Sequence, residues 1–323
     1  MKLKVDPILV IILATLALGL LLPVSGRPAE VLDVVTRVGI FVLFFGYGAR
    51  LSAAETRSGI RNWKLHLAIL STTFVVFPVL ALPVLAIPDS VLSAPIRVGL
   101  IFLCLVPSTV QSSITFTSLA GGNVAAAMVS ATASNVLGVV ITPLLAMAFI
   151  PTASGGSIGF EQVWGVVLQL LLPFVLGQLS RVVTAGFMAT HRKRLKLLDQ
   201  AVIMLIVYGA FSELRVSGVW REIGWRDLAL LIPLALALLA LMFWFTWALG
   251  GWLGFPREDR IALMFCGTKK SLATGVPMAS VLFPGATVGV LVIPLMLFHQ
   301  AQLLASSVLA TRLREGQAGG PNG

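Results

Sequence analysis

Long apolar stretches separated by short polar segments run through the whole chain. A helix needs roughly 17–25 apolar residues to cross a bilayer, and ten stretches meet this requirement. They cover approximately residues 7–23, 31–50, 64–87, 98–119, 123–150, 160–180, 196–213, 227–254, 259–282 and 286–311. The pattern therefore predicts an all-α, polytopic membrane protein with ten transmembrane helices.

Two of these spans contain residues that interrupt a membrane helix. In span four, Pro107 opens a polar run made of Ser108, Thr109, Gln111, Ser112 and Ser113. In span nine, Lys269 and Lys270 follow Gly267 in an otherwise apolar stretch. Non-helical backbone at membrane depth is tolerated where it is buried in protein or lines a cavity. We therefore expect spans four and nine to be broken helices that mark an internal site.

Weak internal similarity relates the two halves of the chain. Residues 102–104 (FLC) precede the first interruption and residues 264–266 (MFC) the second, while residues 142–145 (TPLL) resemble residues 293–296 (IPLM). We predict two five-helix repeats, residues 1–155 and 156–315, followed by a short polar tail, residues 316–323. Because five is odd, the second repeat is inverted, an arrangement common in secondary transporters.

The charged residues agree with a membrane protein and give its orientation. Hydrophobic residues make up 58% of the chain and charged residues 11%, so a soluble domain is excluded. The net charge of +10 comes from short loops between spans, which argues against a nucleic-acid partner. Of the 23 Lys and Arg residues, fifteen fall on one side, six on the other, and two within span nine. Lys and Arg favour the cytoplasmic side, so both termini are expected in the cytoplasm and the protein in the plasma membrane.

Acidic residues are absent from both interrupted spans and from the spans that follow them. None occurs between Asp89 and Glu161, or between Asp259 and Glu315. An ion antiporter that works through a membrane carboxylate would need one there. Lysines beside the positive ends of half-helices favour an anionic group. The pattern indicates an anionic substrate, or a lysine that replaces a coupling cation.

The candidate substrate or ion site combines residues from four spans: Thr109, Gln111, Ser112, Ser113, Asn135, Thr268, Lys269, Lys270, Ser271 and His299. No cofactor is expected apart from a coupling ion. Successive helical residues point about 100° apart, so we expect one lysine to face inward. Two alternatives remain open: a hairpin tip with lysines that reach water, and hydroxyls that only join helices.

An enzyme is the weakest interpretation of this sequence. Residues 155–159 (GGSIG) fit the hydrolase pattern G-x-S-x-G, but that motif needs a preceding strand and a following helix. Here the residues form a short loop between apolar spans. The three histidines, His66, His191 and His299, offer no plausible nucleophile–base pairing. We expect no catalytic residues.

The sequence resembles the bile acid:sodium symporter family over about residues 10–312. Residues 107–123 (PSTVQSSITFTSLAGGN) and 139–145 (VVITPLL) carry the general resemblance. Residues 265–273 (FCGTKKSLA) are similar to the divergent sodium/bile-acid-cotransporter-like branch. The resemblance implies a panel of spans one, two, six and seven, and a core of the other six in which spans four and nine cross. It also implies organic-anion transport, often with sodium held near positions that Ser112 and Ser113 match. The glutamate of span nine that holds sodium in better-studied members is absent here.

Together these observations predict a secondary transporter of a small organic anion that works by alternating access. A strictly sodium-coupled symporter is the first alternative. The second is a membrane protein that transports nothing and regulates ion homeostasis, for example calcium uptake, through a partner.

The distribution of basic residues yields a prediction about topology. A cysteine introduced near Arg192 or at the C-terminus should react with a membrane-impermeant maleimide only from the cytoplasmic side, and one at Ser157 only from outside. The measurement is labelling of intact cells and inverted vesicles. Labelling of position 157 and the C-terminus from the same side would contradict the ten-span topology.

Overall fold

The computed structural model describes residues 7–50, 62–150, 160–218, 221, 224–283 and 285–318. Within these ranges the regular structure is helical and contains no strand. The first part of the chain forms α1 (Pro7–Leu21), α2 (Arg27–Arg50), α4 (Trp63–Ser71), η2 (Thr72–Val76), α5 (Phe77–Leu85), α6 (Ala94–Leu105), α7 (Gln111–Leu119) and α8 (Val124–Phe149). The second part forms α9 (Phe160–Thr190), α10 (Arg192–Ser217), α11 (Trp225–Trp252), α12 (Arg257–Gly267), α13 (Leu272–Leu282) and α14 (Gly285–Ala318).

The length and composition of these helices are those of a polytopic membrane protein. Six described segments are long and apolar enough to cross a bilayer: Trp63–Leu85, Val124–Phe149, Trp164–Thr190, Arg192–Ser217, Trp225–Trp252 and Thr287–Glu315. Val10–Leu21 and Ala94–Leu105 are shorter apolar helices. Large apolar side chains also point outward, for example Leu179 of α9 and Trp244 of α11. Such a surface suits lipid, in which apolar side chains need no burial within the protein.

Several predicted boundaries differ from those of the helices. Helix α9 continues to Thr190, ten residues beyond the predicted end of span six. Helix α14 continues to Ala318, so residues 316–318 of the predicted polar tail are helical. Residues 155–159, predicted to form a loop that includes Ser157, lie outside the described residues, as do residues 319–323 of the predicted tail.

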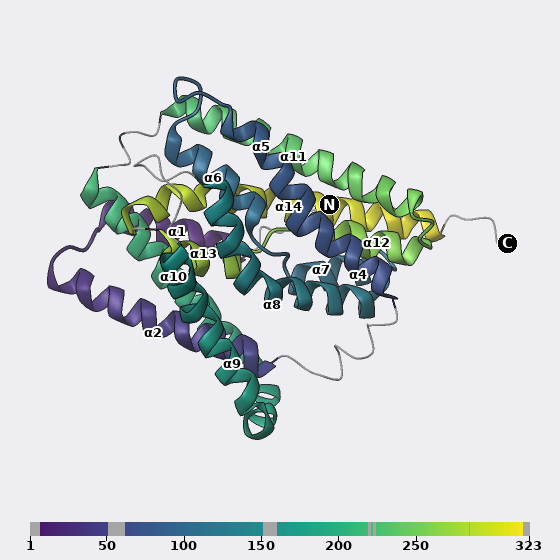
Figure 1. The fold of residues 1–323 in the computed structure, drawn as a ribbon, viewed down its shortest axis with the longest axis horizontal. Coiled ribbons are helices and arrows are strands. Elements are labelled where there is room, and N and C mark those ends of the chain that lie inside the picture. Colours follow the sequence, from purple (N-terminus) through teal and green to yellow (C-terminus); the bar gives the residue numbers. More distant parts are fainter. Residues whose placement is uncertain are drawn as a thin grey trace.

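Two pairs of helices join the beginning of the chain to its second half. Helix α2 packs against α9, and α1 against α10, as the purple and teal ribbons of Figure 1 show. The α2–α9 crossing is close because Gly48 and Gly177 have no side chains. A Cβ at Gly48 would lie 1.9 Å from the Phe174 carbonyl oxygen, and one at Gly177 would lie 2.0 Å from that of Phe45. Small residues at such crossings let helix backbones approach.

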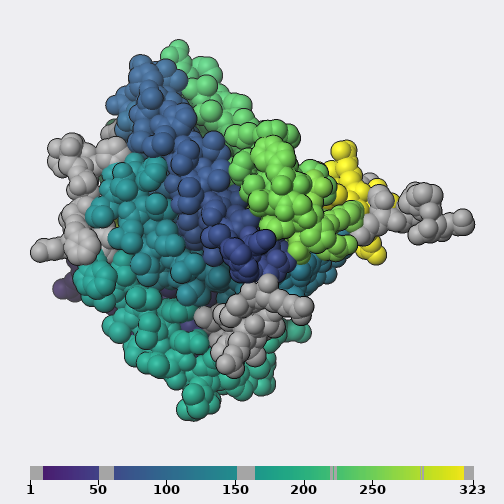
Figure 2. Space-filling view, turned by 45° about the vertical axis from the view of Figure 1, so that its right-hand side comes forward, coloured from purple at the N-terminus to yellow at the C-terminus, as the bar shows by residue number. Residues whose placement is uncertain are grey.

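The remaining helices form a second group around two interrupted segments. Helix α6 packs against α14, and α12 packs against α7, α8 and α11. In the space-filling view the blue band of α4 and α5 lies between the green α11 and teal helices of the first half (Figure 2). Inside this group, residues 106–110 separate α6 from α7, and residues 268–271 separate α12 from α13. The first interruption falls in the predicted span four and the second in the predicted span nine.

The α2–α9 crossing leads to a prediction about stability. Gly48→Ala places a methyl group where the Phe174 carbonyl lies, so the two helices must separate. Such overpacking typically lowers the free energy of unfolding by about 1–3 kcal/mol. Gly165→Ala, also in α9, is the matched control because a Cβ there meets no atom within 4 Å. Thermal unfolding of the detergent-solubilised protein should show a lower Tm for Gly48→Ala alone. Equal Tm values would contradict the close crossing.

Candidate functional site

The two helix interruptions contact each other directly. The Ser271 N–H donates to the Pro107 carbonyl over 2.8 Å, and the Ser108 hydroxyl donates to the Cys266 carbonyl over 2.6 Å. Asn135 of α8 donates its amide N–H to the Ser108 carbonyl over 2.7 Å. Backbone groups freed by one interruption are therefore satisfied by the other and by α8. This crossing brings residues of spans four, five and nine into one polar cluster.

The hydroxyl residues predicted from span four gather at the start of α7. The Thr109 hydroxyl lies 2.5 Å from that of Ser112 and 3.2 Å from that of Ser113. The Ser113 hydroxyl also donates to the Phe265 carbonyl, at the end of α12, over 3.1 Å. Gln111 is exposed instead and lies outside this cluster of buried and half-buried hydroxyls. The structure thus brings together Thr109, Ser112 and Ser113, but not Gln111.

Lys269 is completely buried beside aromatic rings. Its Nζ donates to the Ser306 hydroxyl of α14 over 2.7 Å, and this is its one hydrogen-bond partner among the described residues. The same nitrogen lies 4.4 Å from the centroid of the Phe116 ring and 5.8 Å from that of Phe265. Aromatic faces attract cations, so these rings stabilise the ammonium where water is excluded. An ammonium has three donors, and two remain without a protein acceptor in the described part of the chain.

Lys270 is equally buried but has a different environment. Its Nζ donates to three backbone carbonyls: Cys104 at 2.8 Å, Val106 at 2.9 Å and Thr73 at 3.1 Å. The ring of Phe77 lies 4.0 Å away, centroid to nitrogen. All three ammonium donors therefore have acceptors. In the described residues no carboxylate contacts either lysine.

The backbone of Lys270 is held by α14. Gln302, which is fully buried, accepts from the Lys270 N–H and donates to the Lys270 carbonyl, each over 2.8 Å. Nδ1 of His299 lies 2.8 Å from the Gln302 amide nitrogen and 3.2 Å from the Lys270 carbonyl oxygen. His299 therefore belongs to the support of the interruption, next to Lys270.

Thr268 and Ser271 were also predicted as site residues. Their hydroxyls form hydrogen bonds with nearby backbone groups instead. The Thr268 hydroxyl donates to the Met264 carbonyl of its own helix over 2.7 Å. The Ser271 hydroxyl accepts from the Thr274 N–H over 3.2 Å and so caps the N-terminus of α13. Serine is a favoured residue at this position because it satisfies an N–H that has no partner within the helix.

Two expectations about the lysines are wrong. Only one lysine was expected to face inward, but both side chains are fully buried, because residues 268–271 are not helical and the two can diverge. The hairpin-tip alternative, with lysines in water, fails for the same reason. Sequence reasoning also missed three partners of the lysines: Thr73, Phe77 and Ser306. Pro78, directly after Phe77, was the available sign of an irregular helix.

The oxygen atoms at the crossing are ligands that suit an alkali cation better than a transition metal. The described residues contain no group of three or more His, Cys, Asp or Glu side chains that could hold a metal ion. The hydroxyl oxygens of Thr109, Ser112 and Ser113, with the Phe265 carbonyl, are hard and neutral donors. Hard oxygen donors favour cations such as sodium over softer metals.

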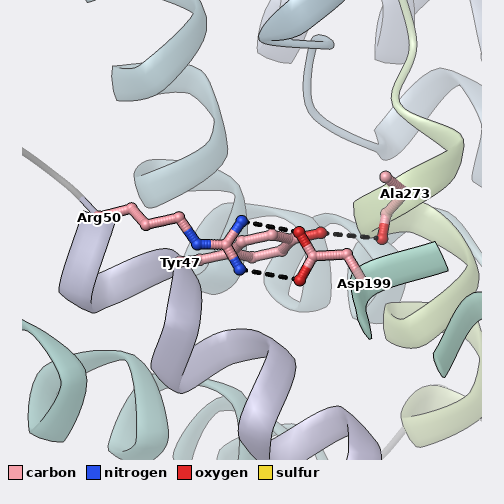
Figure 3. A network of polar contacts seen from close by, with 4 residues as sticks. All are labelled: Tyr47, Arg50, Asp199 and Ala273. Carbon is pink, nitrogen blue, oxygen red and sulfur yellow. Dashed lines mark hydrogen bonds and ion pairs between the residues drawn. The ribbon is translucent and has the colours of Figure 1, made fainter. Parts of the chain in front are cut away.

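A separate polar network connects α2 with α10 and with the start of α13 (Figure 3). Arg50 of α2 forms two hydrogen bonds with Asp199 of α10, at 2.7 and 2.8 Å. The Tyr47 hydroxyl donates to the Ala273 carbonyl over 3.4 Å, and its ring lies 5.6 Å below the Arg50 guanidinium carbon. The sequence pattern does not predict this ion pair. The structure shows that Arg50 and Asp199 pair between α2 and α10, next to the hydrogen bond from Tyr47 to α13.

Comparison with known proteins identifies the family to which this chain belongs. The profile of the SBF-like CPA transporter family matches residues 6–315. An uncharacterized protein of Pseudomonas aeruginosa is 44% identical over 301 residues, which cover 93% of this chain and 90% of that protein. YfeH of Escherichia coli, named as a candidate symporter, is 40% identical over 309 residues, 96% of this chain and 93% of its own.

Vertebrate proteins are more distant relatives. Sodium/bile acid cotransporter 7 of Danio rerio is 28% identical over 305 residues, 92% of this chain and 89% of its own. The resemblance to the divergent cotransporter-like branch, predicted from residues 265–273, is confirmed. The chain is a multi-pass membrane transporter and belongs to the SBF-like CPA transporter family.

Proposed function

We propose that this protein is a secondary active transporter of a small organic anion, with its substrate site at the crossing of the interrupted helices α6–α7 and α12–α13. The observation that carries the proposal is the burial of Lys269 and Lys270 at this crossing with no carboxylate partner in the described residues. A buried charge without a counter-charge is unfavourable. An anionic substrate supplies the missing negative charge.

Lys269 is the lysine that binds the anion in this proposal. Its ammonium has one protein acceptor among the described residues, the Ser306 hydroxyl, whereas that of Lys270 has three. A carboxylate or sulfate beside Lys269 accepts the two remaining hydrogen bonds, and charge-assisted hydrogen bonds are about twice as strong as neutral ones. The hydroxyls of Thr109, Ser112 and Ser113 form the opposing polar wall.

The proposed mechanism is alternating access between two groups of helices. The panel contains α1, α2, α9 and α10, and the core contains the remaining helices. The repeats are residues 1–155 and 156–315, the second inverted. The pairing of α2 with α9 and of α1 with α10 supports this plan, because an inverted repeat relates the two pairs. The network of Tyr47, Arg50 and Asp199 lies where the panel meets α13, at the interface that would slide or rock. The plasma membrane, with both termini cytoplasmic, is the proposed location.

Uptake by purified protein tests the proposal. Carboxylates, sulfated steroids and bile acids are first screened for a rise in Tm, since a ligand of the folded state stabilises it. Labelled forms of the anions that bind are then offered to proteoliposomes. A transporter accumulates at least one of them, whereas a membrane regulator that acts through a partner moves none. Binding with no uptake under any ion gradient would contradict transport.

Replacement of Lys269 by glutamine should abolish that uptake. The change removes the charge proposed to bind the anion but retains polarity and most of the length. Expression and Tm should be preserved, because removal of a buried charge relieves its desolvation cost. Lys64→Gln is the matched control, since Lys64 is exposed on α4. Initial rates of uptake are the measurement. A rate for Lys269→Gln within about twofold of wild type, a difference of only about 0.4 kcal/mol, would remove Lys269 from the site.

A sodium-coupled symporter is the second candidate, favoured by the clustered hydroxyls of Thr109, Ser112 and Ser113 beside the Phe265 carbonyl. If they hold sodium, the double change Ser112→Ala and Ser113→Ala should raise the sodium concentration for half-maximal uptake by roughly tenfold or more, which corresponds to about 1.4 kcal/mol. Ser118→Ala, at an exposed position of α7, is the control. Uptake of wild type that is the same in sodium and choline would exclude this candidate.

A further inference from the structure

Three backbone carbonyls near the centre of the molecule converge on one point, which the Nζ of Lys270 occupies. They belong to Thr73 in η2, to Cys104 in the last turn of α6 and to Val106 directly after α6. Their oxygens lie 2.8–3.1 Å from the nitrogen. The three residues and the lysine come from three separate segments, so the arrangement depends on tertiary packing.

Local structure explains why the Thr73 carbonyl is available. In the π-helical turn η2, the Phe77 N–H donates to the Thr72 carbonyl, five residues back. The next residue, Pro78, has no N–H to offer to Thr73. The Thr73 carbonyl therefore has no partner within its helix and points to the lysine. Single-turn π-helical bulges are frequent at functional sites.

The end of α6 explains the other two carbonyls. The Ser108 N–H, four residues after Cys104, donates to the Ser134 hydroxyl over 3.0 Å and not to Cys104. Pro107 and the extended backbone of Val106 end the helix, so Val106 has no acceptor role within it. Between them, the Leu105 carbonyl accepts from the Thr142 hydroxyl over 2.9 Å. The protein thus leaves two carbonyls of this helix end to Lys270 alone.

The chemistry of this cage is that of a monovalent-cation site. A helix C-terminus carries partial negative charge and favours a cation. Neutral backbone carbonyls replace the hydration shell of alkali cations in membrane proteins, and the C-terminal ends of broken helices coordinate coupling cations in transporters. The ring of Phe77, 4.0 Å from the nitrogen, adds a cation–π contact. Three acceptors match the three donors of one ammonium group.

We propose that the carbonyls of Thr73, Cys104 and Val106 form a monovalent-cation site that Lys270 permanently occupies as a tethered ligand. The protein therefore needs no dissociable cation at this position, and truncation of the lysine opens the site to small cations from solution. Any role of this cation site in transport rests on the proposed function. Cation binding itself is measured without transport, so either proposal can fail alone.

Cation rescue of Lys270→Ala tests this proposal. The Tm of the purified variant is measured against ammonium, methylammonium and sodium chlorides, with choline chloride at equal ionic strength as reference. We expect Lys270→Ala to unfold at a lower temperature than wild type, and ammonium or methylammonium to restore roughly 2–4 °C in a saturable manner. Wild type should not respond to either of these two cations. A response of wild type equal to that of the variant, or no response of the variant, would overturn the proposal.

Two further variants locate the rescue. Lys270→Met fills the vacated volume with an uncharged chain of similar length, so it should lose stability and gain no cation response. Lys269→Ala removes the neighbouring lysine, which contacts a hydroxyl and aromatic rings but no carbonyl cage, and should also show no response. Rescue of either variant to the same extent as Lys270→Ala would place the bound cation elsewhere and contradict the proposal.

If Lys270→Ala cannot be purified in choline buffer, extraction with methylammonium provides the same test. Recovery of monodisperse protein that precipitates when methylammonium is replaced by choline would support an occupied cation site. Failure to recover folded protein with any of the small cations would contradict it, since the vacated cage would then not accept a free cation.

Discussion

Backbone groups released by a broken helix must find partners inside the protein, because lipid offers none. This constraint organises the centre of the molecule. The end of α6 gives its carbonyls to Lys270 and Thr142, and the end of α12 gives its carbonyls to Ser108 and Ser113. Each interruption supplies donors to the other. Neither could be buried at this depth without its counterpart, so the two halves of the chain form one structural unit.

The free carbonyls at the ends of α6 and α12 accept hydrogen bonds from different kinds of donor. This difference determines what each helix end can bind. Hydroxyls complete the end of α12 and leave neutral oxygens that a weakly held cation could share. At the end of α6 the hydrogen bonds come instead from the Lys270 ammonium. The Lys269 ammonium lies beside α14 and α7, and two of its donors have no acceptor in the described residues. Under the proposed function, Lys270 stabilises the fold and Lys269 binds the anionic substrate.

Much of this arrangement is visible in the sequence, because membrane burial makes polar residues informative. The polar residues that stand out in apolar stretches are Lys269, Lys270 and the serines after Pro107. In the structure they lie together where the two interrupted segments cross. The partners of the lysines are less visible. Thr73 acts through a backbone carbonyl, and Ser306 through one hydroxyl on a long helix. The sequence does not predict which backbone carbonyl of a π-helical turn is left without a hydrogen-bond partner in its own helix. The ion pair of Arg50 with Asp199 also depends on packing between helices far apart in sequence.

The adjacency of the two lysines has a structural reason. On a continuous helix, neighbouring side chains point about 100° apart, so one of the pair would face another helix or lipid. Because residues 268–271 are not helical, Lys270 extends toward α6 and η2 while Lys269 extends toward α14 and α7. Gln302 fixes the backbone from which both diverge, through its two hydrogen bonds to Lys270. The interruption of the helix is thus the condition that lets one short segment place two buried charges in two different environments.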